Sequence, residues 1–111
     1  MTSARSWLSV LAVLLAVGLF APAASLAAER HVVIIKDMQY APASIEIRVG
    51  DTVVWENRDD RDHSAAADDK SFSSGNIRAG ASFSHTFTRT GTFKYGCQYH
   101  PRERGTVTVK E

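Results

Sequence analysis

Short stretches in which hydrophobic and polar residues alternate recur along the chain from residue 31 onward. In residues 44–49, for example, Ile45, Ile47 and Val49 fall on one face, which is the period of two that a β-strand shows. Turn signals such as Gly50–Asp51 separate neighbouring stretches, which are rich in β-branched and aromatic residues. The predicted strands are residues 31–36, 44–49, 52–56, 81–88, 92–96 and 106–110. Because no convincing helical period is present, we expect an all-β sandwich or barrel.

One long polar stretch, residues 57–80, interrupts this pattern. It is rich in aspartate and arginine, so we interpret it as a solvated loop over the surface of the domain. The acidic cluster within it, Asp59 to Asp69, either faces water or forms a docking face for a partner. A loop of this length inside a small domain is often functional.

The first 27 residues have the layout of a secretory signal peptide. Arg5 precedes an apolar run, residues 7–20, and a stretch of small residues follows. The run is shorter than the roughly 20 residues that a membrane-spanning helix needs. We therefore expect cleavage after Ala27, with cleavage after Ala28 or an uncleaved anchor as alternatives. The mature domain would be residues 28–111, exported to the periplasm, with no membrane span.

Charge and cysteine content narrow the function further. Loss of Arg5 with the leader leaves 12 basic and 12 acidic residues, and this lack of net charge argues against nucleic acid as a partner. The single cysteine excludes a disulfide within the chain and a zinc ribbon. Small exported domains often need a disulfide or a metal ion for stability, so the composition itself raises the question of a metal.

Cys97 and His100 form the motif that carries the chemistry. A soft thiolate and an imidazole three residues apart, on a turn between two predicted strands, can bind one metal ion. A second imidazole would complete the Cys-His₂ set of copper electron-transfer sites. His31, His63 and His85 are the candidates for it, and spacing alone does not choose between them.

The order of these features resembles the small cupredoxins, in particular the plastocyanin and amicyanin type. The resemblance implies an eight-strand Greek-key β-sandwich with one copper ion, cycling between Cu(II) and Cu(I), held by His63, Cys97 and His100. It also implies that the backbone N–H of Ser64 donates to the thiolate. The matching residues are Tyr40–Pro42, Val49–Trp55, Asn57–Asp59, His63, Phe72–Gly75, Gly80, Phe83–Phe87, Gly91–Tyr95, Cys97, His100–Pro101 and Arg104–Val107.

Glu103 is the main departure from the family pattern, because it stands where the family has a weak axial methionine. We expect it to be a fourth metal ligand. A hard carboxylate favours Cu(II) over Cu(I), which would lower the reduction potential and make the site depend on pH. The alternative is a surface glutamate paired with Arg102 or Arg104. Met38, the one methionine outside the leader, could replace the missing ligand, but we interpret it as a core residue.

These features predict a periplasmic electron carrier rather than an enzyme. The resemblance implies that the edge of His100 is the port for electrons and that Tyr99, Pro101 and Arg102 form the docking rim. One alternative is a copper carrier, buffer or sensor that does not shuttle electrons. Another is a small-molecule redox enzyme with an open copper position. The partner would be an unidentified redox or copper-exchange protein, and we expect a monomer.

Overall fold

The computed structural model describes residues 27–111, which form eight β-strands. No helix among these residues is long and apolar enough to cross a membrane. The predicted signal peptide falls, except for Ala27, in residues 1–26, which lie outside the described residues. The strands are β1 (Arg30–Lys36), β2 (Gln39–Ala41), β3 (Ser44–Arg48), β4 (Thr52–Asn57), β5 (Ala66–Ala67), β6 (Ser82–Thr86), β7 (Gly91–Gly96) and β8 (Arg104–Lys110).

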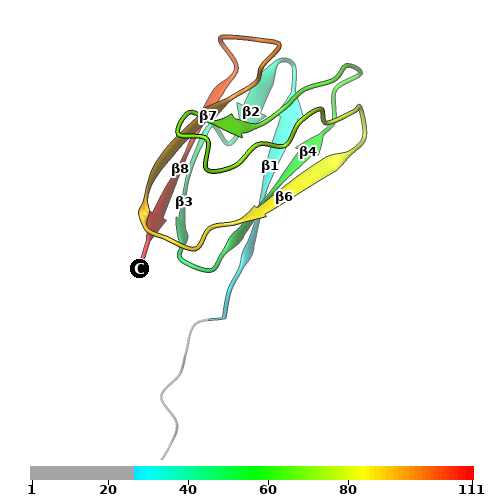
Figure 1. The fold of residues 1–111 in the computed structure, drawn as a ribbon. Helices are drawn as coiled ribbons and strands as arrows, with labels where there is room; N and C mark the ends of the chain where they lie inside the picture. Colours follow the sequence, from blue (N-terminus) through cyan, green and yellow to red (C-terminus); the bar gives the residue numbers. More distant parts are fainter. Residues whose placement is uncertain (1–26) are drawn as a thin grey trace, which may run out of the picture.

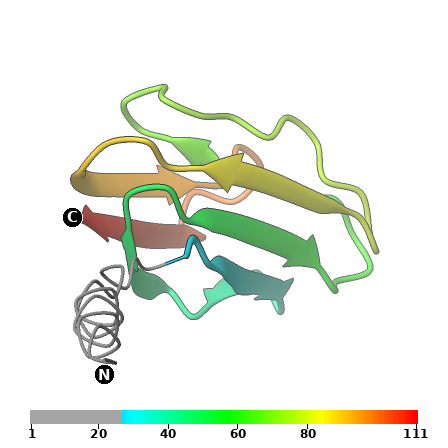
Figure 2. The same ribbon diagram turned by 90° about the horizontal axis from the view of Figure 1, so that it is seen from below.

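The strands form two four-stranded sheets that pack into a sandwich (Figure 1 and Figure 2). One sheet has the order β2-β1-β4-β6 and the other the order β3-β8-β7-β5. β1 pairs with β4 and β3 pairs with β8 in parallel, whereas every other named pairing is antiparallel. The expected all-β Greek-key sandwich of eight strands is therefore confirmed.

The core lies between the two sheets and is built from the side chains that point inward from the strands of both sheets. Val33, Ile35, Val53 and Trp55 are fully buried in the first sheet, and the second sheet supplies residues such as Tyr95. The Trp55 and Tyr95 rings meet edge to face at 5.3 Å between centroids. Such aromatic contacts add to the free energy gained by burying apolar area, so they fix the spacing between the sheets.

The interpretation of residues 57–80 as a solvated loop is wrong for much of the segment. Ala65, Phe72 and Ile77 are buried, and the segment contributes β5, which pairs with β7. Phe72 stacks on Trp55 at 5.3 Å between ring centroids. The polar residues between these apolar ones face water, while the apolar residues turn the segment back onto the core.

Met38 is not the core residue that we expected. It lies in the tight turn between β1 and β2 and is 38% exposed. Both Asp37 and Met38 have positive φ angles, of 53° and 63°. This left-handed backbone closes the two-residue hairpin and points the Met38 side chain away from the core.

Two loops that are distant in sequence meet at one end of the sandwich. β1 and β4 run in the same direction, and β4 ends there at Asn57. β7 reaches the same end at Gly96, because Gly96 pairs with Ala66 of the segment that follows β4. The loop between β7 and β8 therefore lies beside the loop between β4 and β5 (Figure 1).

Candidate metal centre

The loop between β7 and β8 supplies three of the predicted ligands, Cys97, His100 and Glu103. Its own backbone holds it in a tight turn. The N–H of Glu103 donates to the carbonyl of His100 at 2.9 Å, and the N–H of Cys97 donates to the carbonyl of Glu103 at 3.3 Å. The three side chains are thereby directed to one side of the turn.

His63 comes from the other loop and is fixed by an exchange of backbone hydrogen bonds. Its N–H donates to the carbonyl of Ile77 at 3.1 Å, and the N–H of Ile77 donates to the carbonyl of His63 at 2.7 Å. The buried Asn57 side chain adds hydrogen bonds to the carbonyls of Arg61 and Ile77, both at 2.9 Å. The His63 ring thus stands on a braced backbone although it lies outside the strands.

The structure brings all four predicted metal ligands together. One donor atom from each of His63, Cys97, His100 and Glu103 lies within 4.8 Å of the other three. Oε1 of Glu103 is 2.8 Å from Nδ1 of His63 and 3.1 Å from Nδ1 of His100. Sγ of Cys97 is 3.6 Å from the same His100 nitrogen. Of the three histidines that the spacing left open, His63 is the one in this group.

Glu103 is buried, and it is not the surface glutamate of the alternative interpretation. It is 2% exposed, and its ion-pair contacts are with the imidazoles of His63 and His100. The neighbouring Arg104 pairs instead with Asp68. Oε2 of Glu103 is buried without a hydrogen-bond partner. A carboxylate oxygen left in this state costs free energy unless something else binds it, and a metal ion among the four donors would do so.

Asp59 was missed as part of the site. Its Oδ2 atom lies 2.8 Å from Nε2 of His63, and its carboxylate also accepts the N–H groups of Asp37 at 3.0 Å and Met38 at 3.2 Å. Desolvation alone would raise the pKa of Asp59, but these N–H groups and the His63 ring together hold it below its ordinary value. An anionic Asp59 accepts a hydrogen bond from a proton on Nε2 of His63. The Nδ1 atom, which faces Cys97 and Glu103, is then the ring nitrogen that can bind a metal ion.

The surroundings of the thiol differ from what the resemblance implied. The N–H that reaches Sγ of Cys97 is that of Tyr99, at 3.4 Å, whereas Ser64 offers its hydroxyl oxygen to the N–H of Gln98 at 2.9 Å. The Tyr40 hydroxyl donates to the carbonyl of Ser64. Burial, with added repulsion from Glu103, raises the pKa of Tyr40 far above its ordinary range, so it remains a donor. Ser64 thus joins the two ligand loops to each other and to β2.

The other two histidines lie elsewhere. His85 stands on β6, where its ring stacks on Phe72 at 4.9 Å and meets Phe87 edge to face at 4.7 Å. Desolvation lowers its pKa, which suits a half-buried strand residue. His31 lies near the start of β1 and pairs with Asp51.

The donor set fits a copper ion. One thiolate and two imidazoles are the ligands of copper electron-transfer sites, and a weaker axial donor commonly accompanies them. Glu103 offers a carboxylate in that role, and its Oε2 atom has no other partner. The four side chains are also enclosed: His63 is fully buried, Cys97 is 7% exposed, and only His100 has a partly exposed edge.

Comparison with known proteins gives the same assignment. A family model described as a cupredoxin-like domain matches residues 9–109. The amicyanin of Paracoccus denitrificans is 33% identical over 93 residues, which cover 79% of this chain and 71% of that protein. Two solved structures have a TM-score of 0.69 and 33% identity. The novel purple cupredoxin from Nitrosopumilus maritimus matches 72% of this chain and 99% of its own. An amicyanin mutant in its Cu(I) form matches 78% of this chain and 87% of its own.

The family model covers most of the chain, and the amicyanin match extends over more than two thirds of that relative. The fold and the gathered thiol and imidazole donors agree with both. The chain therefore belongs to the cupredoxin family.

Proposed function

We propose that this protein is a one-electron carrier whose copper ion is held by His63, Cys97, His100 and Glu103. The observation that carries the proposal is the burial of Glu103 between the two imidazoles, with one carboxylate oxygen left unpartnered. Copper supplies a one-electron Cu(II)/Cu(I) couple when it is bound. The chain supplies the ligands and keeps them in place.

Rigidity of the ligand loops supports electron transfer. Both loops are held by backbone hydrogen bonds, and Nε2 of the His63 ring is hydrogen-bonded to the Asp59 carboxylate. A site whose ligands do not move between oxidation states reorganises little, which favours fast transfer. Copper handling, by contrast, would need a loop that opens.

His100 is the proposed entry point for electrons. Its side chain is 21% exposed, whereas that of His63 is 0% exposed, so only the His100 edge can touch a partner. Tyr99, Pro101 and Arg102 are exposed around it and would form the docking rim. The proposed partner is a redox or copper-exchange protein that docks on this rim.

Glu103 gives the proposed site a low reduction potential. A carboxylate is a harder and more charged donor than the thioether that the family uses, so it stabilises Cu(II) relative to Cu(I). The apolar core beneath the loops excludes water from the Glu103 carboxylate, which strengthens its electrostatic stabilisation of Cu(II).

The visible and electron paramagnetic resonance spectra of the Cu(II)-loaded protein test this assignment. We expect a green or red wild type, a shift toward blue in Glu103→Met, and a higher reduction potential in that variant. Glu103→Gln separates charge from size, and we expect an intermediate potential. Identical spectra for wild type and Glu103→Met would remove Glu103 from the ligand set. Absence of an intense thiolate band would remove copper from the proposal.

A copper carrier or buffer is the second candidate, because the same buried carboxylate would favour retention of Cu(II). Transfer to a competing chelator distinguishes the two functions. An electron carrier should keep its ion in both oxidation states, whereas a delivery protein should release it rapidly in one. We favour the electron carrier over an enzyme, since the described residues around the group are packed rather than open.

We also propose that residues 1–27 are removed on export and that residues 28–111 act as a periplasmic monomer. The apolar run with its small-residue cleavage region supports export and removal of the leader. N-terminal sequencing of the protein recovered from the periplasm checks the cleavage point. Recovery of the intact leader in the membrane fraction would favour the uncleaved anchor.

A further inference from the structure

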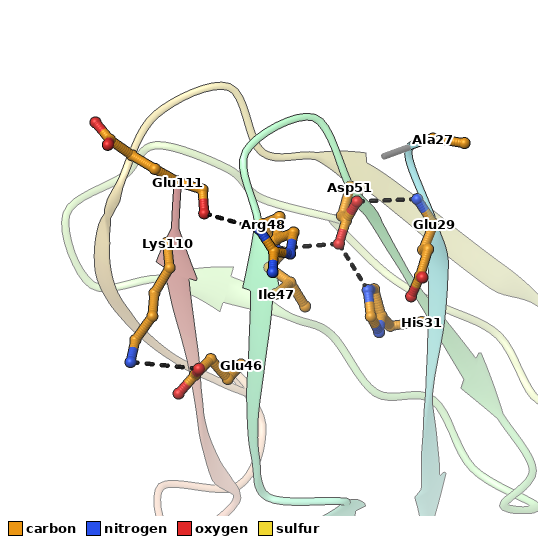
Figure 3. Close-up of a pocket in the computed structure, with 9 residues that line it drawn as sticks. All are labelled: Ala27, Glu29, His31, Glu46, Ile47, Arg48, Asp51, Lys110 and Glu111. Carbon is orange, nitrogen blue, oxygen red and sulfur yellow. Dashed lines mark hydrogen bonds and ion pairs between the residues drawn. The ribbon is translucent and has the colours of Figure 1, made fainter. Parts of the chain in front are cut away.

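A second group of metal-ligating side chains lies at the end of the sandwich opposite the copper ligands (Figure 1 and Figure 3). Glu29 precedes β1, His31 is the second residue of β1, and Asp51 lies in the turn between β3 and β4. Parallel pairing places Arg30 opposite Thr52, which brings Glu29 level with Asp51. The sheet therefore holds these side chains together although about 20 residues separate them.

The Asp51 carboxylate is the fixed member of the group. It is 4% exposed, and its Oδ1 atom accepts the N–H of Glu29 at 2.9 Å. Its Oδ2 atom accepts the N–H of Arg48 at 3.0 Å and lies 2.9 Å from Nε2 of His31. The N–H groups of Glu29 and Arg48, with the His31 ring, hold the pKa of Asp51 at about 2. The carboxylate is therefore an anion at neutral pH.

The distances between donor atoms suit a single ion. One donor atom from each of Glu29, His31 and Asp51 lies within 4.8 Å of the other two. Two donors bound tetrahedrally to one ion at about 2.0 to 2.2 Å lie about 3.4 Å apart. His31 and Asp51 are hydrogen-bonded at 2.9 Å, so an ion would replace that bond and the half-buried His31 ring and the exposed Glu29 side chain would both shift slightly.

Glu29, His31 and Asp51 line a surface recess together with two cations, Arg48 and Lys110. Both cations contact other groups. The Lys110 ammonium pairs with Glu46 at 3.3 Å, and the Arg48 guanidinium donates to the backbone carbonyl of Glu111 at 3.2 Å. Figure 3 shows the Glu29 carboxylate beside the His31 ring, with no interaction drawn to it from the other labelled residues. Neither the Lys110 ammonium nor the Arg48 guanidinium therefore pairs with the carboxylate of Glu29 or of Asp51.

We propose that Glu29, His31 and Asp51 form a second metal site, which binds a divalent first-row transition-metal ion. One imidazole with two carboxylates is a set of borderline and hard donors that suits Zn²⁺ and Cu²⁺. It lacks a thiolate, so it would bind without the colour or the redox activity of the copper–thiolate group. Binding would also tie the start of β1 to the turn before β4.

Zinc titration of the copper-loaded protein tests the proposal. Calorimetry should show one saturable zinc site, and nuclear magnetic resonance should show shifts confined to residues 29–31 and 48–52. We expect His31→Gln and Glu29→Gln each to weaken zinc binding at least about tenfold, as loss of a direct ligand should exceed or equal the effect of an outer partner. Neither substitution disturbs a buried core residue.

Two matched controls make the outcome decisive. Glu111→Gln removes another carboxylate from the same recess without breaking the Lys110–Glu46 ion pair, and His85→Gln removes another half-buried strand histidine, so both should leave zinc binding unchanged. The proposal is overturned if no second zinc binds or if His31→Gln binds zinc like the wild type. If zinc binds only while the copper–thiolate colour disappears, it is displacing copper from the first site, and this result also overturns the proposal. The same titration of the Cys97→Ser variant, whose first site lacks its thiolate, measures zinc binding at the second site in a protein without copper.

Discussion

Asp59 contacts one of the proposed copper ligands, His63, without belonging to the proposed ligand set. It joins the loop after β4 to the first hairpin, since its carboxylate accepts hydrogen bonds from the His63 ring and from the β1–β2 turn at Asp37 and Met38. That turn needs left-handed backbone at both residues, and the two N–H groups it presents are satisfied by one anion. The orientation of His63 is therefore coupled to the geometry of a hairpin in the first sheet.

Removal of this carboxylate should weaken copper binding. Asp59→Ala frees the far nitrogen of His63, so we expect about a 10-fold to 100-fold loss in affinity for copper. Asp59→Asn should lose less, because its amide oxygen can still accept the Nε2 proton. Competition against a chelator measures the affinities. Asp60→Ala is the control, since that side chain is 92% exposed, and equal affinities for all the proteins would contradict this role for Asp59.

The β7–β8 pair depends on the absence of a side chain at Gly105. Tyr95 and Gly105 are directly opposite each other in the two strands, and a Cβ at Gly105 would collide with the Tyr95 ring. Tyr95 is 1% exposed and packs edge to face on both Tyr40 and Trp55, so it cannot move away.

Gly105→Ala should therefore destabilise the fold by about 1 to 3 kcal/mol, as overpacking of a core does. Urea denaturation of the metal-free protein measures the free energy of unfolding. Thr108→Ala on the same strand is the control, because its side chain is only half-buried. A loss within about 0.5 kcal/mol of the control would show that the ring yields at little cost.

β6 carries a histidine whose burial should make stability depend on pH. The His85 pKa is lowered because its ring is desolvated between Phe72 and Phe87, in a recess also lined by Ser71 and Arg89. The unfolded chain binds a proton at about pH 6.5, whereas the folded chain resists it. The free energy of unfolding should therefore fall as the pH drops below about 6.5.

Comparison with His85→Gln isolates this contribution, because every other ionisable group is the same in the two proteins. Denaturation between pH 7.5 and pH 5 should show a steeper loss in the wild type than in the variant. Parallel curves would mean that His85 takes up its proton equally well in both states.

Most of these elements could be predicted from the sequence, and the exceptions have physical reasons. β3, β6, β7 and β8 show the alternation that a half-buried sheet requires, whereas β1 and β4 are recognisable as short runs of consecutive apolar residues. β2 and β5 contain three and two residues, which is too short for any period to be visible. Phe72 could be predicted as a core residue, and Ile77 could have signalled that residues 57–80 turn inward again, since it is a large apolar residue in a polar segment.

The proposed ligand set was more predictable from the sequence than the residues that orient it. The spacing of Cys97 and His100, together with the family resemblance, indicated His63 and Glu103 correctly as neighbours. The inward turn of Glu103 could not be read from its position beside two arginines. Asp59 stood out only within the matching run Asn57–Asp59 and the acidic cluster, and neither indicated its contact with His63, because the irregular loop between the two residues does not fix where a side chain points.

At the scale of the whole molecule, the proposed copper ligands bridge the two sheets. His63 lies on the loop that leaves β4 of the first sheet, and Cys97, His100 and Glu103 lie on the loop between two strands of the second. Without an ion, this end holds a buried carboxylate oxygen with no partner and two imidazoles crowded around the other oxygen. An ion binds the folded chain only, so it should stabilise the sandwich.

Removal of the metal should therefore lower the melting temperature by a large amount. With free copper at about 1,000 times the dissociation constant, binding contributes about 4 kcal/mol. For a domain of this size that corresponds to roughly 15 to 30 °C. Calorimetry of the loaded and the chelator-treated protein measures the difference. Cys97→Ser should melt near the metal-free protein and respond weakly to copper, because its thiolate is gone. If the loaded and stripped proteins melt together, the two loops hold their positions unaided, and the ion is needed for electron transfer alone.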